Sequence, residues 1–264
     1  MSRYADVHCH LSFPEFDSDR DVVIARMRET GVGLLIDPGT DAASSRRSIA
    51  LADQHDFIYA NVGLHPSEVR TPCTPELIDE LAALARAKKV VGIGEIGLDY
   101  HWPGYDRENQ TEAFREMLRM AISLDLPVVI HCRDAWQDML RVLDEERSSN
   151  LRGMMHCFSG DLDIARQCIK FGLKISVPGT ITYKKSPLPE VVASVSLNDL
   201  LSETDAPYLS PVPMRGKRNE PAYVAHTVRA VADSRPEPFE AVTDALVTNA
   251  RKLFGIPDTV SGCV

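Results

Sequence analysis

The 264-residue sequence has no apolar run approaching the roughly 18 residues that cross a bilayer, and its first residues lack the apolar core of a signal peptide. It has no basic excess: the formal net charge is −9, whereas proteins that coat nucleic acids usually present a basic face. No C-x-x-C pair occurs among its six cysteines, which argues against a zinc ribbon or a dithiol redox motif. We therefore expect a soluble, cytoplasmic protein without membrane contact, in which any anionic substrate is attracted locally.

The sequence also lacks an obvious linker, a low-complexity tract or a charge block. With 44% hydrophobic residues, the chain can bury a core of full size. These features favour one domain over residues 1–264. Nothing in the sequence indicates an oligomer, so a monomer is the default expectation.

Short apolar, β-prone runs alternate with amphipathic patterns. Thr74-Pro75 provides an N-cap and a first-turn proline, residues 106–124 carry an apolar stripe, and a last helix ends at Gly255. Such alternation predicts parallel strands covered by helices. The eight expected strands are residues 5–8, 33–37, 58–62, 90–95, 127–131, 153–156, 173–177 and 200–203.

Five of these runs end in metal-type side chains. The residues are His8 and His10, Glu95, His131, His156 and Asp205. In an open doubly wound sheet they would be spread across its width, because such a sheet gathers ligands mainly at one crevice. A closed barrel brings the carboxyl ends of all its strands to one mouth. The distribution therefore predicts an α/β fold, a (β/α)8 TIM barrel with a metal site at its C-terminal mouth.

Each candidate ligand has an ordinary alternative. His8 and His10 taken alone suit a surface pair, and His131 or His156 taken alone suits a hydrogen-bonded core histidine. Buried acids are rarer unless they are paired or metal-bound. Glu203 shares the parity of Asp205 and is an alternative to it; Asp205 is preferred because it lies closer to the mouth.

The charge of the set favours two metal ions. Four neutral histidines and two carboxylates carry −2, so two divalent cations bring the site to +2, which suits a phosphate anion. The sequence does not identify the metal, and Mg, Mn and Zn all remain candidates. Cys9, Cys132 and Cys157 directly follow ligand histidines and are expected to face the opposite side, as small buried hydrophobes.

Taken together, these segments resemble the TatD family of metal-dependent deoxyribonucleases, a group of barrel hydrolases with binuclear centres. The Gly-Glu-Ile-Gly-Leu-Asp-Tyr string is the most specific of them. The resemblance is carried by residues 6–11, 63–66, 92–100, 127–135, 156–160 and 203–209, and more weakly by 218–221 and 249–254.

The resemblance implies that Glu95 bridges two divalent ions, with His8, His10 and Asp205 on one ion and His131 and His156 on the other. It implies hydrolysis of DNA, of the 3′→5′ exonuclease type and linked to DNA repair, acting on single-stranded DNA or DNA ends. Glu95 and Asp205 would be the catalytic residues, with Asp205 orienting or deprotonating the attacking water.

A second group of residues is expected to contact substrate or support the ligands. His65 would donate to a phosphate oxygen, or else cap a loop, and Arg133 would hold a phosphate, or else form a rim salt bridge. Asp6 would orient a ligand histidine or be a plain buried acid. Residues 99–102 would provide an aromatic platform or pack a loop, and residues 184–185 and 215–218 would track a phosphate backbone or be solvated.

Two other functions remain open from the sequence. Related binuclear barrels hydrolyse other ester or amide bonds, and a TatD-like chain acting on aminoacyl-tRNA is one such alternative. A non-catalytic, metal-stabilised binding protein is the other. The complete ligand set weighs against the second.

Overall fold

The computed structural model describes residues 3–257 and contains one eight-stranded sheet. Each strand runs parallel to the next, in sequence order. The strands are β1 (Tyr4–Asp6), β2 (Val32–Pro38), β3 (Ile58–Val62), β4 (Val90–Asp99), β5 (Val128–Arg133), β6 (Gly153–Met155), β7 (Leu173–Val177) and β8 (Leu200–Ser202).

The last strand returns to the first. The backbone N–H of Val7, just past β1, donates to Ser202 O at 3.1 Å, and Ser202 Oγ donates to Ala5 O at 2.9 Å. The prediction of a closed (β/α)8 barrel, rather than an open sheet, is thereby confirmed.

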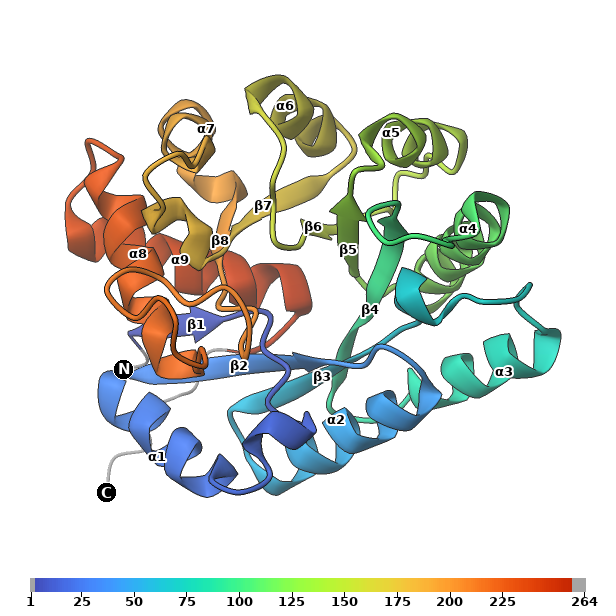
Figure 1. The fold of residues 1–264 in the computed structure, drawn as a ribbon, viewed down its shortest axis with the longest axis horizontal. Coiled ribbons are helices and arrows are strands. Elements are labelled where there is room, and N and C mark those ends of the chain that lie inside the picture. The colour runs from blue at the N-terminus through green and yellow to red at the C-terminus, as the bar shows by residue number, and fades with distance from the viewer. Residues whose placement is uncertain (1–2, 258–264) are drawn as a thin grey trace.

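Helices surround the strands on the outside (Figure 1). Those predicted at residues 74, 106 and 255 have the expected ends: Thr74 and Asp106 accept from backbone N–H groups of the first turn, and Gly255 ends its helix at φ +62°. None of the helices within residues 3–257 combines the length and hydropathy of a membrane span. The helices are α1 (Arg20–Thr30), α2 (Ala42–Gln54), α3 (Pro75–Leu84), α4 (Arg107–Leu124), α5 (Trp136–Glu145), α6 (Leu162–Lys170), α7 (Leu188–Ser194), α8 (Val224–Asp233) and α9 (Phe239–Phe254).

Two apolar layers hold the barrel together. Successive side chains of β2 alternate between them: Leu34 and Ile36 pack in the inner cluster, whereas Leu35 packs in the large outer cluster under the helices. The end of α9 contributes Phe254, and the following turn Ile256, to the inner cluster. Apolar side chains therefore fill the interior at one end and leave the opposite mouth for polar groups.

Six strands end at other residues than expected. β2 and β5 end one and two residues later and β6 ends one residue earlier, whereas the ends of β1, β4 and β8 affect the site. β4 continues to Asp99, because Leu98 and Asp99 still pair with Cys132 and Arg133 of β5. β1 ends at Asp6 and β8 at Ser202. As a result, Glu95 lies inside its strand, and the histidines after β1 lie on the segment that turns into the mouth.

Candidate metal centre

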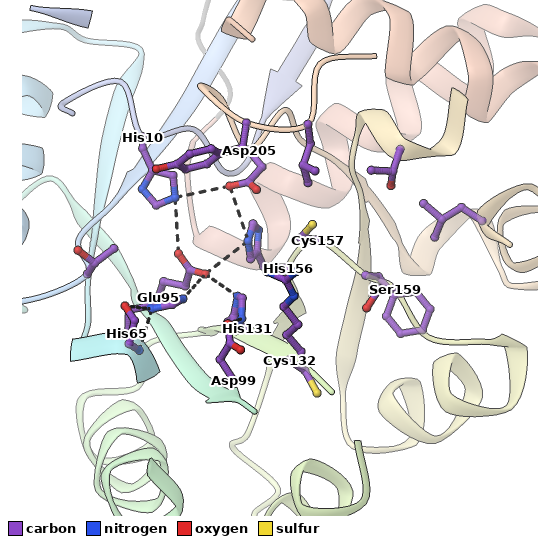
Figure 2. A pocket seen from close by; sticks show the side chains of 18 of the residues that line it. His10, His65, Glu95, Asp99, His131, Cys132, His156, Cys157, Ser159 and Asp205 are labelled. Carbon is purple, nitrogen blue, oxygen red and sulfur yellow. Dashed lines mark hydrogen bonds and ion pairs between the residues drawn. The ribbon is translucent and has the colours of Figure 1, made fainter. Parts of the chain in front are cut away.

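Four histidines and two carboxylates meet at the carboxyl end of the barrel. The Nε2 atoms of His8 and His10 lie 3.2 Å apart, and the rings of His8 and His156 stack with centroids 3.5 Å apart. His8, His10 and His156 are each at most 4% exposed. Figure 2 shows His10, Glu95, His131, His156 and Asp205 pointing toward one another.

Glu95 occupies the middle of this cluster. Its Oε2 lies 3.4 Å from His8 Nε2 and 3.6 Å from His10 Nε2. Its Oε1 faces the other side, 3.0 Å from His131 Nδ1 and 3.5 Å from His156 Nε2. Each oxygen of one carboxylate therefore faces a different pair of imidazoles.

A bulge in β4 sets the position of Glu95. Ile93 pairs with Val128 and Ile96 with Ile130, so β4 has one more residue than β5 between these pairs. Such a bulge redirects a side chain locally. At Gly97 the φ of +137° is accessible to glycine, and a Cβ there would lie 2.0 Å from His131 O, so this glycine permits the close approach of the two strands.

Asp205 closes the cluster from the segment after β8. Its backbone, at φ +56°, donates from N–H to His8 O at 2.9 Å. Its Oδ1 lies 3.5 Å from His10 Nε2, 3.8 Å from His8 Nε2 and 3.9 Å from His156 Nε2. Asp205 thus lies with Glu95 among the Nε2 atoms of His8, His10 and His156, whereas Glu203 contacts His156 from its Nδ1 side.

Two further carboxylates orient the histidines on the second side. Asp99 Oδ2 lies 3.1 Å from His131 Nε2, and Glu203 Oε2 lies 3.1 Å from His156 Nδ1. We assign the proton of each ring to the nitrogen beside its carboxylate, which turns the lone pair of His131 Nδ1 and of His156 Nε2 toward Glu95. These tautomers are the ones that can ligate a cation.

Glu203 is itself held by buried donors. It is fully buried and accepts from the backbone N–H of Cys157 at 2.6 Å and from Ser176 Oγ at 2.6 Å, besides His156. From the sequence, Glu203 is expected only as an alternative to Asp205, and Asp99 has no role of its own beyond the family string and residues 99–102. Their positions, two residues before a candidate ligand and at the end of a long strand, were the available signals.

Electrostatics at the site favour bound positive charge. Burial alone would lower the pKa of His156, but Glu203 and Glu95 outweigh it and raise that pKa to about 10. Burial and the neighbouring His156 lower the pKa of His8 to about 3. Burial opposes ionisation of Glu95, yet His65 and His156 hold its pKa well below the usual range. The carboxylates thus stabilise cationic charge among the histidines.

The donor set fits divalent metal ions. Zinc–nitrogen bonds of about 2.0–2.1 Å in a tetrahedron place ligand atoms roughly 3.3–3.4 Å apart. The distances of 3.2, 3.4 and 3.6 Å among His8, His10 and Glu95 match that spacing. The set also mixes imidazole and carboxylate donors, which suits zinc, manganese and iron. Other groups of suitable spacing are His8 with His156 and Asp205, His156 with Cys157 and Glu203, and, by spacing alone, His65 with Glu95 and His131.

His65 lies at the edge of the cluster with its Nε2 3.4 Å from Glu95 Oε1. Its Nδ1 accepts from the backbone N–H of Ser67 at 3.1 Å, so the proton of the neutral ring lies on Nε2. A protonated Nε2 donates to an anion and cannot ligate a metal. The structure thus confirms the loop-capping alternative for His65, and this cap fixes the tautomer.

Arg133 lies on the exposed rim of a cavity of about 960 Å³ above the cluster. It forms no ion pair with any carboxylate of residues 3–257, so the rim salt bridge is not formed there. Its guanidinium instead lies 5.4 Å from the ring centroid of Trp102. Of the basic loop residues, Lys185 lines the cavity, whereas Arg218 pairs with Asp19 at 2.7 Å.

Asp6 is a buried structural acid and contacts no imidazole in the structure. Its carboxylate accepts from Thr204 Oγ1 at 2.6 Å and from Thr204 N–H at 2.9 Å, which ties β1 to the segment that carries Asp205. Burial, only partly offset by these bonds, raises its pKa to about 8.

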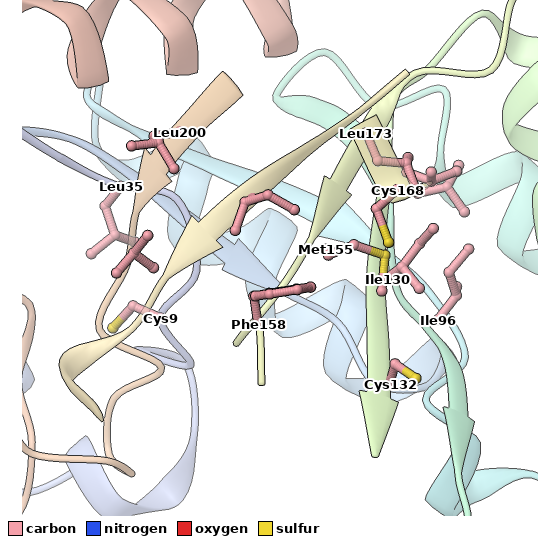
Figure 3. Close-up of a cluster of buried hydrophobic side chains, with 14 of the residues drawn as sticks. Cys9, Leu35, Ile96, Ile130, Cys132, Met155, Phe158, Cys168, Leu173 and Leu200 are labelled. Atoms are coloured by element: carbon pink, nitrogen blue, oxygen red, sulfur yellow. The ribbon is translucent and has the colours of Figure 1, made fainter. Parts of the chain in front are cut away.

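The expectation for the cysteines was partly wrong. Cys9 is fully buried in the outer apolar cluster, as expected, and Cys132 packs there too while bordering the cavity (Figure 3). Cys157 instead is partly exposed and lines the cavity. It lies past the end of β6 with φ +45°, so the alternation of a strand no longer applies to it.

Known proteins resemble this chain over nearly its whole length. The family model described as TatD related DNase matches residues 5–255. YabD of Bacillus subtilis, named an uncharacterised metal-dependent hydrolase, is 38% identical over 95% of this chain and 98% of its own. The protein of Pantoea ananatis named 3′-5′ ssDNA/RNA exonuclease TatD is 34% identical over 95% of this chain and 99% of its own.

The crystal structure of YjjV, a TatD homologue from Escherichia coli, superimposes with a TM-score of 0.92 at 35% identity, covering 97% of this chain and 99% of that one. Fold and site thus define a metal-dependent hydrolase built on a (β/α)8 barrel. Within that class, the chain belongs to the TatD family.

Proposed function

We propose that this protein is a divalent-metal-dependent deoxyribonuclease of the 3′-5′ exonuclease type. The observation that carries the proposal is the position of Glu95, whose two oxygens face two separate groups of imidazoles. Glu95 would bridge two ions, with His8, His10 and Asp205 on one and His131 and His156 on the other. Names of relatives such as the Pantoea exonuclease support a nucleic-acid substrate.

Two divalent ions, when bound, supply positive charge to a phosphoryl transition state and lower the pKa of an attacking water. The chain's own residues then have distinct tasks. Asp205, with Oδ1 3.5 Å from His10 Nε2 at the open side of the cluster, would orient that water and accept its proton. Asp99 and Glu203 would hold His131 and His156 in their ligating tautomers.

Substrate contacts would come from the rim. His65 Nε2–H would donate to a phosphate oxygen near Glu95, where hydrogen bonds to an anion are stronger than neutral ones. Arg133, without a carboxylate partner in residues 3–257, would receive a phosphate further from the scissile bond. Its planar fork suits bidentate phosphate contact.

The proposal is tested with end-labelled single- and double-stranded DNA and RNA in the presence of Mg, Mn or Zn. We expect stepwise release of nucleotides from 3′ ends, loss on chelation, and near two ions per chain by elemental analysis. Glu95→Gln should abolish cleavage while leaving the circular dichroism spectrum intact, and Glu190→Gln on α7 is the matched control. Full activity of the Glu95 variant in a metal-checked preparation would refute the bridging role, and hydrolysis confined to other esters would refute the nuclease.

A further inference from the structure

The two sides of the cavity mouth carry opposite charge. On the side of β5 and β7, Arg133 and Lys185 line the cavity and are exposed. On the side of β1 to β3, the cavity continues past Phe13 and Tyr208 into a second hollow of about 530 Å³. We call the first pair, together with Trp102, the basic rim. The acidic rim comprises the carboxylates that line the second hollow, Glu15, Asp41 and Glu68, which are accompanied there by Arg47.

Trp102 is the unusual member of the basic rim. It follows β4, lines the cavity and is 59% exposed, although a large apolar ring in water is costly. Its neighbour Tyr105 stacks on Tyr100 with centroids 4.7 Å apart, and so packs its own loop. The described contacts of the Trp102 ring are with His101, at 5.1 Å, and with the guanidinium of Arg133. One face of an exposed indole beside a cation is a surface on which a nucleobase can stack.

A polyanion crossing the mouth meets these two rims differently. Arg133 and Lys185 attract phosphates. Binding of a strand there depends on the salt concentration, because each neutralised phosphate releases counterions. Glu15, Asp41 and Glu68 repel a second stretch of phosphates and so disfavour a strand that continues across the site. A strand that ends at the metal centre contacts only the basic rim and so avoids this repulsion.

We infer that a single nucleic-acid strand leaves the metal centre over the basic rim, with a base stacked on Trp102 and nearby phosphates on Arg133 and Lys185. The acidic rim then faces only the terminal nucleotide. This inference rests on the proposed nuclease function and deepens it, because it assigns the path of the strand and a physical reason for acting at ends.

The test compares a mononucleotide p-nitrophenyl ester with single-stranded oligonucleotides of two to eight nucleotides. For the unaltered protein, kcat/KM should rise with length and then level off. Trp102→Ala should lower kcat/KM for the longer substrates roughly tenfold more than for the mononucleotide ester, given the usual size of base stacking on aromatic side chains. That excess should vanish when the nucleotide that stacks is made abasic, which a merely structural role of Trp102 would not produce. Tyr105→Ala, in the same loop but packed on Tyr100, should leave the ratio unchanged.

The phosphate contacts are tested by measuring KM at several salt concentrations. Arg133→Gln and Lys185→Gln should each reduce the slope of log KM against log salt by about 0.7, the value for one phosphate of a single strand. Lys170→Gln on α6 should not change the slope. The strand path is wrong if the unaltered protein cleaves both kinds of substrate with a kcat/KM that does not depend on length, or if Trp102→Ala lowers kcat/KM equally for both. The proposed nuclease function would remain supported in either case. If neither kind of substrate is cleaved with any metal, both the nuclease and the strand path fall.

Discussion

Glu203 Oε2 lies 3.1 Å from His156 Nδ1, so that a fully buried carboxylate holds the ring whose other nitrogen faces the centre of the site. The same carboxylate accepts from Ser176 Oγ and from the N–H of Cys157. The geometry of His156 therefore depends on an acid whose two oxygens are held by three hydrogen bonds.

Replacing Glu203 should weaken metal binding without removing a ligand. Glu203→Gln keeps the shape but loses the charge that orients His156, and loss of such a partner typically costs about 10- to 100-fold in metal affinity. Isothermal titration with Mn or Zn measures this, with Glu190→Gln as the surface control. An affinity equal to that of the unaltered protein would show that Glu203 has no orienting role.

From the tautomer of His65 we predict a loss of activity without a loss of metal. Because its Nδ1 accepts from Ser67 N–H, its Nε2 is a donor, so His65→Ala should lower phosphodiester kcat/KM by about 10- to 100-fold, the worth of a hydrogen bond to a charged group. The metal content should stay the same. His226→Ala on α8, a histidine that does not line the cavity, is the matched control. A loss of one ion per chain in the His65 variant would instead make His65 a ligand.

The ion pair of Asp138 on α5 predicts that stability depends on pH. The hydrogen bonds from Arg107, with a smaller contribution from the Tyr100 hydroxyl, outweigh burial, which alone would raise the pKa of this carboxyl, and hold that pKa well below its usual range. A lowered pKa in the folded state stabilises the protein above the unfolded pKa, and this stabilisation is lost as pH falls toward the folded pKa.

Asp138→Asn should therefore reduce the free energy of unfolding at pH 7, and the difference from the unaltered protein should shrink between roughly pH 5 and pH 3. Urea unfolding at several pH values measures it, with Asp144→Asn as an exposed comparison on the same helix. A difference that does not vary with pH would mean that packing, not charge, is what the substitution removes.

The inner apolar cluster should depend strongly on Phe254. This side chain is 4% exposed at the end of α9, among residues of the barrel interior, and Phe→Ala changes in cores typically cost about 3–5 kcal/mol. Val22→Ala, at a position 54% exposed, should change the free energy of unfolding by less than about 0.5 kcal/mol. A small effect of Phe254→Ala in chemical denaturation would show that α9 does not close the barrel.

Much of the fold was predictable because each strand is an apolar run with turn or cap residues beside it. The eight strands and the helix ends at Thr74, Asp106 and Gly255 are confirmed. The grouping of Glu95 with four histidines could also be expected, because a barrel has only one mouth for residues that end strands.

Contacts that depend on local backbone geometry could not be predicted. The bulge at Glu95, the positive φ of Cys157 and Asp205, and the pairing of Asp99 with His131 arise from tertiary packing, which a strand period of two does not encode. Likewise, the Trp102–Arg133 contact joins the loop after β4 to the end of β5, and their relative position follows from the completed barrel.

The contacts between the segments that follow β1 and β8 also imply an order of steps in folding. Asp205 N–H bonds to His8 O, and Asp6 bonds to Thr204, so residues made nearly two hundred positions apart must meet before His8, His10 and Asp205 share a centre. During synthesis, a chain that still lacks residues 200–206 has most of its barrel but lacks Asp205, and so the group that it would complete with His8 and His10. Binding of an ion by this group would therefore report that the ring has closed.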